Sequence, residues 1–353
     1  MTGYQNALSG PWAVISGGSY NIASGDRASV SGGQFNIASG SDSVVAGGMS
    51  NEASGTSALV GGGAYNIASG ETAVIAGGVY NIASGDGAVV SAGLENQATG
   101  NMSSVSGGQQ NNAAGEFSSV AGGMNNVGTG SYTFLAGGGG QNAETGNVAY
   151  SNYAVVIGGK TNYAGDPEQA DYEVAEHAAV FGGQQNSSLG TSTMVAGGVH
   201  NIAMGDHSSV SGGYQNTASG SLAGLSGGYL NVADGLSSFV SGGYGNSAGG
   251  EYSVISGGKE NVTSGQYSIV SGGYVNTAAG NHSSVAGGRQ NEANGNYTGV
   301  SGGWKNKAIG DYSVVSGGYT NQSTGSYSVV GGGKVRTAPG DFNWVAGGLL
   351  QAE

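Results

Sequence analysis

The chain has 353 residues, of which 76 are glycine and only 8% are charged, and 21 acidic against 8 basic residues give a net charge of -13 at pH 7. So much glycine without a Gly-X-Y period excludes collagen, and the sparse Lys and Arg residues argue against nucleic acid as a partner. No apolar stretch is long enough to insert into a membrane as a helix, and the absence of cysteine excludes disulfides and thiolate metal sites.

A unit of the form V-S-G-G-x-x-N-x-A-x-G-x-x-S-x recurs along the whole chain. Its aliphatic residue occurs 22 times, at a spacing of fifteen that is interrupted only between Leu135 and Val180. A glycine pair follows nearly every aliphatic residue, and an asparagine usually lies six residues after it. Internal repeats of such a short period predict a solenoid.

Each unit is expected to form two short β-strands and two turns. Fifteen residues are too few for a pair of helices, and glycine destabilises a helix by about 1 kcal/mol. The strand through Val30 places that side chain inward and the flanking serines outward, and a second strand over residues 36–38 places its asparagine inward. Gly32-Gly33 and Gly40 are expected in the turns, where glycine adopts positive φ without steric cost.

Stacked coils of this kind predict an all-β fold, a parallel β-solenoid of about 22 fifteen-residue coils in a single domain over residues 1–353, uncapped at both ends. The predicted core consists of the inward aliphatic residues, among them Ile15, Val30, Val45, Val60, Val210, Val240, Val285 and Val345. The predicted structural ladder consists of stacked side-chain amides that also hold the turns, among them Asn21, Asn36, Asn51, Asn66, Asn81, Asn216, Asn231, Asn246, Asn276 and Asn321.

The core of each coil holds one aliphatic side chain with one or two small residues. Burying so few apolar groups hardly offsets the entropy lost by ordering fifteen residues, so lateral association of chains is expected to stabilise the stack. The outward residues that flank the aliphatic position support this expectation. They are small or apolar and carry no charge, as at Ser31, Ser211 and Phe239. A long uncharged face predicts an oligomer interface, and an exposed serine-rich sheet is the alternative.

Two longer units interrupt the period, and the extra residues are assigned to loops near residues 144–153 and 166–177. Both loops are expected in the same turn of neighbouring coils, where they would form one lateral knob suited to binding. The second loop holds weak candidate ligands for calcium, namely Asp166, Glu168, Asp171, Glu173 and Glu176. A solvated acidic loop is the favoured alternative, because the spacing matches no calcium-binding motif.

No catalytic arrangement is evident, so the chain is not expected to be an enzyme or to need a cofactor. Only four histidines occur, and serines lie near them by composition alone. Paired carboxylates for glycan cleavage are conceivable only in the acidic loop. The glycines form no phosphate-binding loop, because none opens a helix with a Lys-Ser/Thr pair.

The segments Ser208-Ser209-Val210-Ser211-Gly212-Gly213 and Asn216-Thr217-Ala218-Ser219-Gly220 resemble the head repeats of YadA-type trimeric autotransporter adhesins. They are equally similar to the glycine- and asparagine-rich shafts of phage tail fibres. The resemblance covers nearly the whole chain. It implies a left-handed parallel β-roll that assembles as a homotrimer.

These features favour a fibre shaft or adhesin of a virion tail fibre or bacterial surface. Such a protein would be extracellular, at the cell surface or on the virion, and would present elements that bind a cell-surface glycan or protein receptor. A filament that polymerises by stacking its open coils end to end is the alternative. A flat-faced ice- or glycan-binding solenoid is a third hypothesis, weakened by the lack of a regular Thr-x-Thr face.

Overall fold

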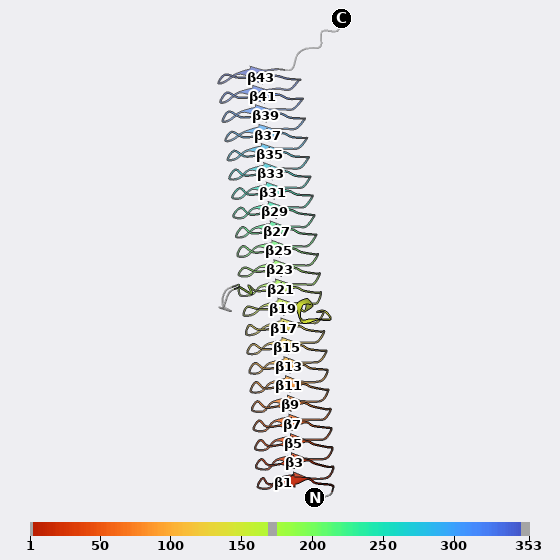
Figure 1. Ribbon diagram of the computed structural model, residues 1–353. Coiled ribbons are helices and arrows are strands. Elements are labelled where there is room, and N and C mark those ends of the chain that lie inside the picture. Colours follow the sequence, from red (N-terminus) through yellow and green to blue (C-terminus); the bar gives the residue numbers. More distant parts are fainter. Residues whose placement is uncertain (1–2, 169–174, 347–353) are drawn as a thin grey trace. The chain divides into compact units, whose positions relative to one another are not determined.

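A computed structural model describes residues 3–168 and 175–346. The coils fall into two compact units, Met1–Gln185 and Asn186–Glu353. In both units a coil contributes one odd-numbered and one even-numbered strand, each two residues long. Figure 1 labels the odd-numbered strands along each unit. The predicted parallel β-solenoid of about 22 fifteen-residue coils is confirmed, and the single helix among the described residues is the 3-10 turn η1 (Ala143–Thr145).

In the first unit the strands form two rows. The odd-numbered strands are β1 (Ala7–Leu8), β3 (Ile22–Ala23), β5 (Ile37–Ala38), β7 (Glu52–Ala53), β9 (Ile67–Ala68), β11 (Ile82–Ala83), β13 (Gln97–Ala98), β15 (Asn112–Ala113), β17 (Val127–Gly128), β19 (Val148–Ala149) and β21 (Tyr163–Ala164). The even-numbered strands are β2 (Val14–Ile15), β4 (Ser29–Val30), β6 (Val44–Val45), β8 (Leu59–Val60), β10 (Val74–Ile75), β12 (Val89–Val90), β14 (Ser104–Val105), β16 (Ser119–Val120), β18 (Phe134–Leu135), β20 (Val155–Val156) and β22 (Ala179–Val180).

The second unit repeats the two rows. Its odd-numbered strands are β23 (Ser187–Ser188), β25 (Ile202–Ala203), β27 (Thr217–Ala218), β29 (Val232–Ala233), β31 (Ser247–Ala248), β33 (Val262–Thr263), β35 (Thr277–Ala278), β37 (Glu292–Ala293), β39 (Lys307–Ala308), β41 (Gln322–Ser323) and β43 (Thr337–Ala338). Its even-numbered strands are β24 (Met194–Val195), β26 (Ser209–Val210), β28 (Gly224–Leu225), β30 (Phe239–Val240), β32 (Val254–Ile255), β34 (Ile269–Val270), β36 (Ser284–Val285), β38 (Gly299–Val300), β40 (Val314–Val315), β42 (Val329–Val330) and β44 (Trp344–Val345).

Within each unit, a coil pairs with the next one in parallel and in register, fifteen residues further along. In the even row Val44 pairs with Leu59, and in the odd row Ile37 pairs with Glu52. A third contact was not expected from the sequence. A single residue in the first turn of each regular coil forms its own parallel bridge, as Tyr214 does with Tyr229. Consecutive coils are therefore held together at three places around the coil.

The core holds one large aliphatic side chain per coil, surrounded by small residues. Of the eight predicted core residues, Ile15 through Val285 are buried, for example Val30 at 0% exposure. Val345 is only partly buried, because it lies in the last described coil, with a described coil on one side of it. The interior is completed by rows of alanine, serine and asparagine, which explains how a coil of fifteen residues closes around so few apolar atoms.

The glycines serve two different purposes. Gly33 adopts a φ of +89°, and a Cβ at this position would collide with the carbonyl of Gly48 in the next coil. Gly40 does not adopt positive φ, but a Cβ there would collide with the carbonyl of Gly55. The expectation that Gly32 and Gly40 use positive φ is therefore wrong. Gly40 is needed for the close approach of two coils, and a Cβ at Gly32 would meet open space.

Most of the positive φ angles outside the glycine pairs belong to other residue types. Each regular coil places one residue of each turn in the left-handed region, as at Phe35 (φ 59°) and Asp42 (φ 57°). Large and β-branched residues such as Val275 (φ 55°) also adopt this conformation, which costs about 1–2 kcal/mol per residue. The closed coil therefore imposes backbone angles that the local sequence disfavours.

We predict that alanine substitutions at the two glycines of one pair have different effects on stability. Gly33→Ala should lower the free energy of unfolding by about 2 kcal/mol or more, because it adds a backbone clash to an unfavourable φ. Gly32→Ala is the control, and it should stay within about 0.5 kcal/mol of the wild type. Urea unfolding followed by circular dichroism measures both. Equal losses for the two variants would contradict this account of the turn.

Candidate functional site

The asparagine at the ladder position is buried in the coils from Asn21 to Asn321, and its amide bonds to the backbone of its own coil and of the next one. Asn36 donates from Nδ2 to the carbonyl oxygens of Gly32 (3.0 Å) and Gly48 (2.9 Å). Its Oδ1 accepts a hydrogen bond from the backbone N–H of Asn51 at 3.0 Å. The same pattern recurs in the second unit at Asn231. Each amide therefore closes its own glycine turn and joins that turn to the next coil.

The bonds of this ladder run mainly from side chain to backbone. Direct bonds between neighbouring amides also occur in both units, for example from Asn66 Nδ2 to Asn51 Oδ1 (3.1 Å) and from Asn216 to Asn201 (3.1 Å). Where the repeat departs from asparagine, the row ends. The backbone N–H of Arg336 still donates to Asn321 Oδ1 at 2.9 Å, but Arg336 itself is exposed.

We predict that replacing Asn216, Asn231 and Asn246 together by alanine lowers the melting temperature. Each change leaves the glycine carbonyl of its own turn without a donor and one backbone N–H without an acceptor, at a cost of about 1–3 kcal/mol per site. The glycine carbonyl of the next coil loses one of its two donors, since a backbone N–H such as that of Tyr214 still binds it. The control replaces the outward neighbours Thr217, Val232 and Ser247 by alanine in the same strands. Melting unchanged from the wild type, or equal to that of the control, would contradict the ladder's stabilising role.

The first insertion lies earlier in the chain than the sequence suggested. Asn147 takes the ladder position, and Val148 pairs with Val127 of the preceding coil. The ring of Tyr153 stacks on that of Tyr132 at 5.1 Å, as expected for a regular coil. The six extra residues are therefore 141–146, which contain η1, and most of the segment assigned to residues 144–153 is regular coil.

The second insertion lies in the other turn of its coil. Asn162 and β21 occupy regular positions, and the coil resumes at His177, whose ring stacks on Tyr153 at 4.9 Å. The two insertions leave their coils at opposite ends, as Figure 1 shows within the first unit. The expectation of one shared knob is therefore wrong, because one insertion precedes the odd strand and the other follows it.

The acidic candidates of the second insertion are only partly described. Asp171 and Glu173 lie outside the described residues. Asp166 Oδ1 accepts from the backbone N–H of Glu168 (2.9 Å), and Glu176 accepts from Asn152 Nδ2 (3.5 Å). Over residues 3–168 and 175–346, no three His, Asp or Glu side chains lie close enough together to hold a metal ion.

We predict different outcomes for two deletions of six residues, each of which restores the fifteen-residue spacing. Removing residues 141–146 should preserve the fold, because it joins one regular coil to the next and changes loop-closure entropy by about 1 kcal/mol or less. Removing residues 147–152 should destabilise the chain, because it deletes Asn147 and β19. Thermal unfolding of both variants measures the difference. Equal stability would contradict the placement of this insertion.

A row of stacked rings, which was not predicted from the sequence, lines the second turn. In the second unit seven rings stack at 4.7–5.1 Å with interplanar angles of 1–12°: Tyr252, Tyr267, His282, Tyr297, Tyr312, Tyr327 and Phe342. The spacing of fifteen was visible in the sequence. The contact was not, because it requires each ring to project from a left-handed residue of a closed turn.

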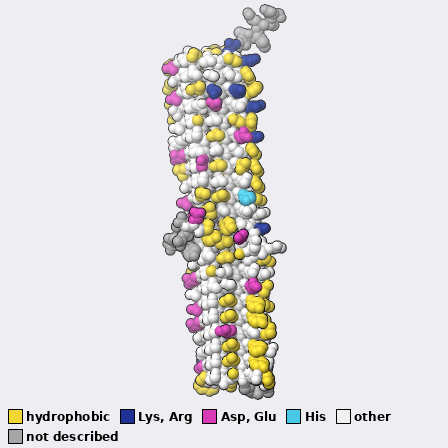
Figure 2. All heavy atoms as spheres, in the orientation of Figure 1, with side chains coloured by type: hydrophobic (Ala, Val, Ile, Leu, Met, Phe, Trp, Pro, Cys, Tyr) yellow, Lys and Arg dark blue, Asp and Glu magenta, His cyan; other side chains and the backbone are white. Residues whose placement is uncertain are grey.

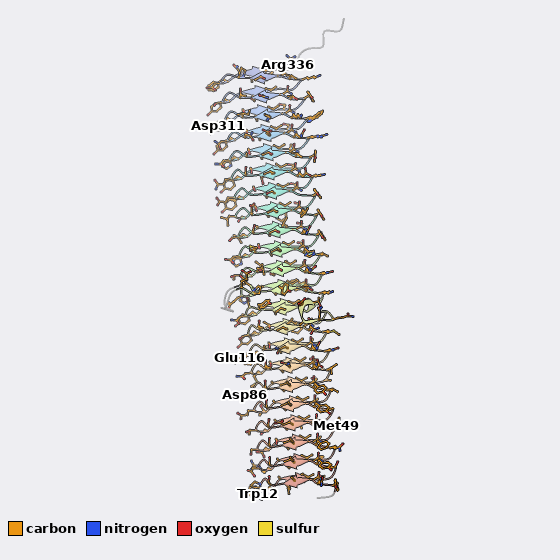
Figure 3. All side chains as sticks on the ribbon, in the orientation of Figure 1. Trp12, Met49, Asp86, Glu116, Asp311 and Arg336 are labelled. Carbon is orange, nitrogen blue, oxygen red and sulfur yellow. The ribbon has the colours of Figure 1, made fainter. Side chains whose placement is uncertain are left out.

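Acidic residues gather along this same second turn. Figure 3 labels Asp86 and Glu116 in the first unit and Asp311 in the second, all at the turn that follows an odd strand. Two of these side chains accept hydrogen bonds from a neighbouring coil: Asp86 Oδ1 accepts from the backbone N–H of Glu71 at 3.0 Å, and Asp311 Oδ1 accepts from that of Asn296 at 2.8 Å. This turn therefore carries a second, exposed ladder beside the rings.

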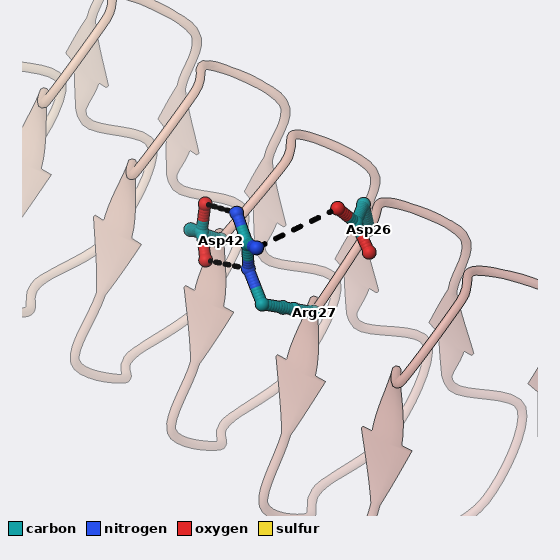
Figure 4. Close-up of polar contacts among 3 residues, drawn as sticks. All are labelled: Asp26, Arg27 and Asp42. Atoms are coloured by element: carbon teal, nitrogen blue, oxygen red, sulfur yellow. Dashed lines mark hydrogen bonds and ion pairs between the residues drawn. The ribbon is translucent and has the colours of Figure 1, made fainter.

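An ion pair bridges two coils at the same turn of the first unit. The Arg27 guanidinium donates from Nε to Asp42 Oδ1 (2.6 Å) and from Nη2 to Asp42 Oδ2 (2.7 Å), and its Nη1 lies 3.9 Å from Asp26 Oδ2 (Figure 4). The hydrogen bond from Arg27 holds the pKa of Asp42 below its usual range. Any stabilisation is present above the unfolded pKa of Asp42 and is lost as the pH falls through the folded value. It is small, because Arg27 is exposed and Asp42 is only half-buried, so water screens the pair.

Two tyrosines meet between consecutive coils of the first unit, Tyr150 directly after β19 and Tyr163 in β21. Burial raises the pKa of the Tyr150 hydroxyl, and the neighbouring Tyr163 adds to this shift. The two rings lie 6.2 Å apart.

The outward side of the even strands carries no charge in either unit. We call this surface the even-strand face; it consists of the residues directly before and after the buried aliphatic residue of each even strand. Many of them are small and exposed, as at Ser211, Ser226 and Ser241. Large apolar side chains are also exposed on it, among them Phe134 (39%), Phe181 (45%) and Ile269 (43%).

No protein-family model matches the chain, and no curated protein matches it in sequence. Among the described residues no helix has the length and hydropathy of a membrane-spanning segment. The candidate functional features of this chain are therefore the ones that its own geometry provides: the uncharged even-strand face, the two turns with their different side chains, and the two insertions.

Proposed function

We propose that the chain is a structural fibre shaft or adhesin, in which three copies associate through the even-strand face. The observation that carries this proposal is the chemistry of that face, which is free of charge in all 22 coils. The odd strands differ, since their outward residues include Glu52, Glu292 and Lys307. An uncharged face beside a charged one supports a specific interface, because burying an unpaired charge is costly.

The thin core gives the same proposal a physical reason. Each coil buries one large aliphatic side chain, and apolar residues such as Phe134 and Phe239 lie exposed on the even-strand face. Covering these side chains with a second and third copy stabilises the stack by about 25 cal/mol for each Å² of apolar surface removed from water. The extracellular or virion location rests on the resemblance to adhesin and tail-fibre repeats alone.

Repetition supports a structural role over a catalytic one. Nearly every coil presents the same buried asparagine and glycines in the same bonds, so these residues act in stacking. A repetitive support of this kind presents binding elements at defined places along its length. Solution mass and electron micrographs of the purified chain test the proposal. Discrete particles of three chains support a shaft, and indefinite filaments support the end-to-end polymer instead.

We predict that arginine at Ser211, Ser226 and Ser241 together prevents this association. All three side chains are exposed, so a single chain should keep its fold and circular dichroism spectrum. The control introduces arginine at Thr217, Val232 and Ser247 on the odd strands, where a lysine already occurs at the equivalent Lys307. Light scattering should give a single chain for the first variant and the wild-type mass for the control. Wild-type mass for both variants would contradict the proposed interface.

A further inference from the structure

Basic residues are concentrated in one part of the second unit. Six of the eight Lys and Arg residues of the chain lie between Lys259 and Arg336, a segment with only three acidic residues. Its net charge is therefore +3, although the whole chain carries -13. Figure 2 shows dark-blue side chains gathered on this part of the second unit, with acidic side chains along another edge.

Six consecutive coils of this segment form what we call the basic–aromatic ridge. It consists of the bridging residues of the first turn, which pair in sequence from coil to coil: Lys259, Tyr274, Arg289, Trp304, Tyr319 and Lys334. All are exposed except Tyr274, which is half-buried. Adjacent coils are about 4.8 Å apart, so the ridge presents a cation or a ring at each step over about 24 Å.

Cations and rings of the ridge pack against one another. Lys259 Nζ lies 5.5 Å from the centroid of Tyr274, and the Arg289 guanidinium lies 5.3 Å from the same ring. Arg289 also lies 5.4 Å from Trp304, and Lys334 lies 5.7 Å from Tyr319. These contacts restrict the cations to fixed positions while leaving them open to solvent. The charged side chains are thus held in place in the absence of a partner.

Little of this charge is neutralised within the chain. Lys259 pairs with Glu260 at 3.5 Å, and Lys307 pairs with Glu292 at 2.9 Å. Within residues 3–168 and 175–346 no carboxylate lies within ion-pair distance of Arg289, Lys305 or Lys334. The acidic second turn lies at the other end of each coil. The ridge is therefore complementary to an anionic partner that extends along several coils.

We propose that the basic–aromatic ridge binds a linear anionic polysaccharide, one that bears sulfate or carboxylate groups. A regular row of donors suits a polymer with regularly spaced anions. Nucleic acid is disfavoured by the geometry of the rings, because single-stranded bases bind by stacking on free aromatic faces. The faces of Tyr274 are occupied by Lys259 and Arg289, which leaves charged donors and ring edges outward. Sulfates, carboxylates and sugar hydroxyls accept hydrogen bonds from the ammonium and guanidinium groups of Lys259 and Arg289.

An anionic polysaccharide would be the receptor of the proposed adhesin, and this part of the inference rests on the proposed function. The experiment uses the purified full chain and heparin as the probe, with desulfated heparin, neutral dextran and a single-stranded oligonucleotide for comparison. We expect heparin to bind in low salt, binding to weaken as salt is raised, and dextran not to bind. Retained binding to dextran, or stronger binding of the oligonucleotide than of heparin, overturns the proposal.

Two charge-matched variants locate the site. Lys259→Gln with Arg289→Gln removes two positive charges from the ridge, and Ser221→Asp with Asn281→Asp adds two negative charges at the exposed second turn of the same unit. The net charge changes equally, so a general electrostatic effect would weaken both variants alike. We expect about a tenfold loss of heparin affinity for the ridge variant and little change for the control. Equal loss in the two variants overturns the ridge as the site.

The oligomeric mass of each sample separates this inference from the proposed function. A wild-type chain that forms trimers but does not bind heparin refutes the ridge and leaves the shaft proposal standing. A chain that binds heparin through the ridge as a single copy supports the inference and refutes the trimer. Circular dichroism and melting of the two variants confirm that both are folded, so a loss of binding is attributable to the ridge.

Discussion

Backbone hydrogen bonding between consecutive coils is the interaction on which the rest of this structure depends. The strands are two residues long, too short to be stable except in a stack. In a typical coil the N–H groups of Ser209, Tyr214 and Thr217 donate to the next coil at 2.9 Å each, on three different sides. These bonds fix the separation and the register of the coils. Every other feature of the chain has to fit that separation.

The close approach of the coils explains the composition. Glycine is required where two backbones meet, as at Gly40, and where the turn needs positive φ, as at Gly33. Asparagine is required because its amide supplies the donor for a turn carbonyl such as that of Gly32 and the acceptor for a backbone N–H of the next coil, as for Asn51. The same separation matches the stacking distance of aromatic rings, so rings at one position of successive coils form a continuous row. The single spacing between coils thus favours glycine, asparagine and aromatic residues, each at its own position in the coil.

Because the core is thin, much of the chain's chemistry lies on its surface. The odd and even strands and the two turns present four different surfaces, and each repeats its chemistry from coil to coil. The even-strand face is uncharged, the second turn is acidic and lined with rings, and part of the first turn of the second unit is basic and aromatic. Separation of these properties around the coil lets one surface associate with further copies while another meets a charged polymer. That arrangement underlies both proposals made for this chain.

The sequence by itself determined the solenoid, its period, the inward aliphatic residues and the buried asparagines, since each occupies a fixed place in a unit repeated 22 times. The placement of the insertions could not be predicted correctly, because the long units depart from the repeat. Asn142, Asn147 and Asn152 all lie in the first long unit, and only the paired strands show that Asn147 holds the ladder position.

The tertiary structure alone decided which turn holds each insertion, which non-glycine residues adopt positive φ, and which rings and cations meet. Phe35 and Val275 carry no local sign of a left-handed conformation, because closing the coil imposes it. Contacts such as that of Arg289 with Tyr274 join residues fifteen positions apart, and they form only after hydrogen bonds between coils have set the register.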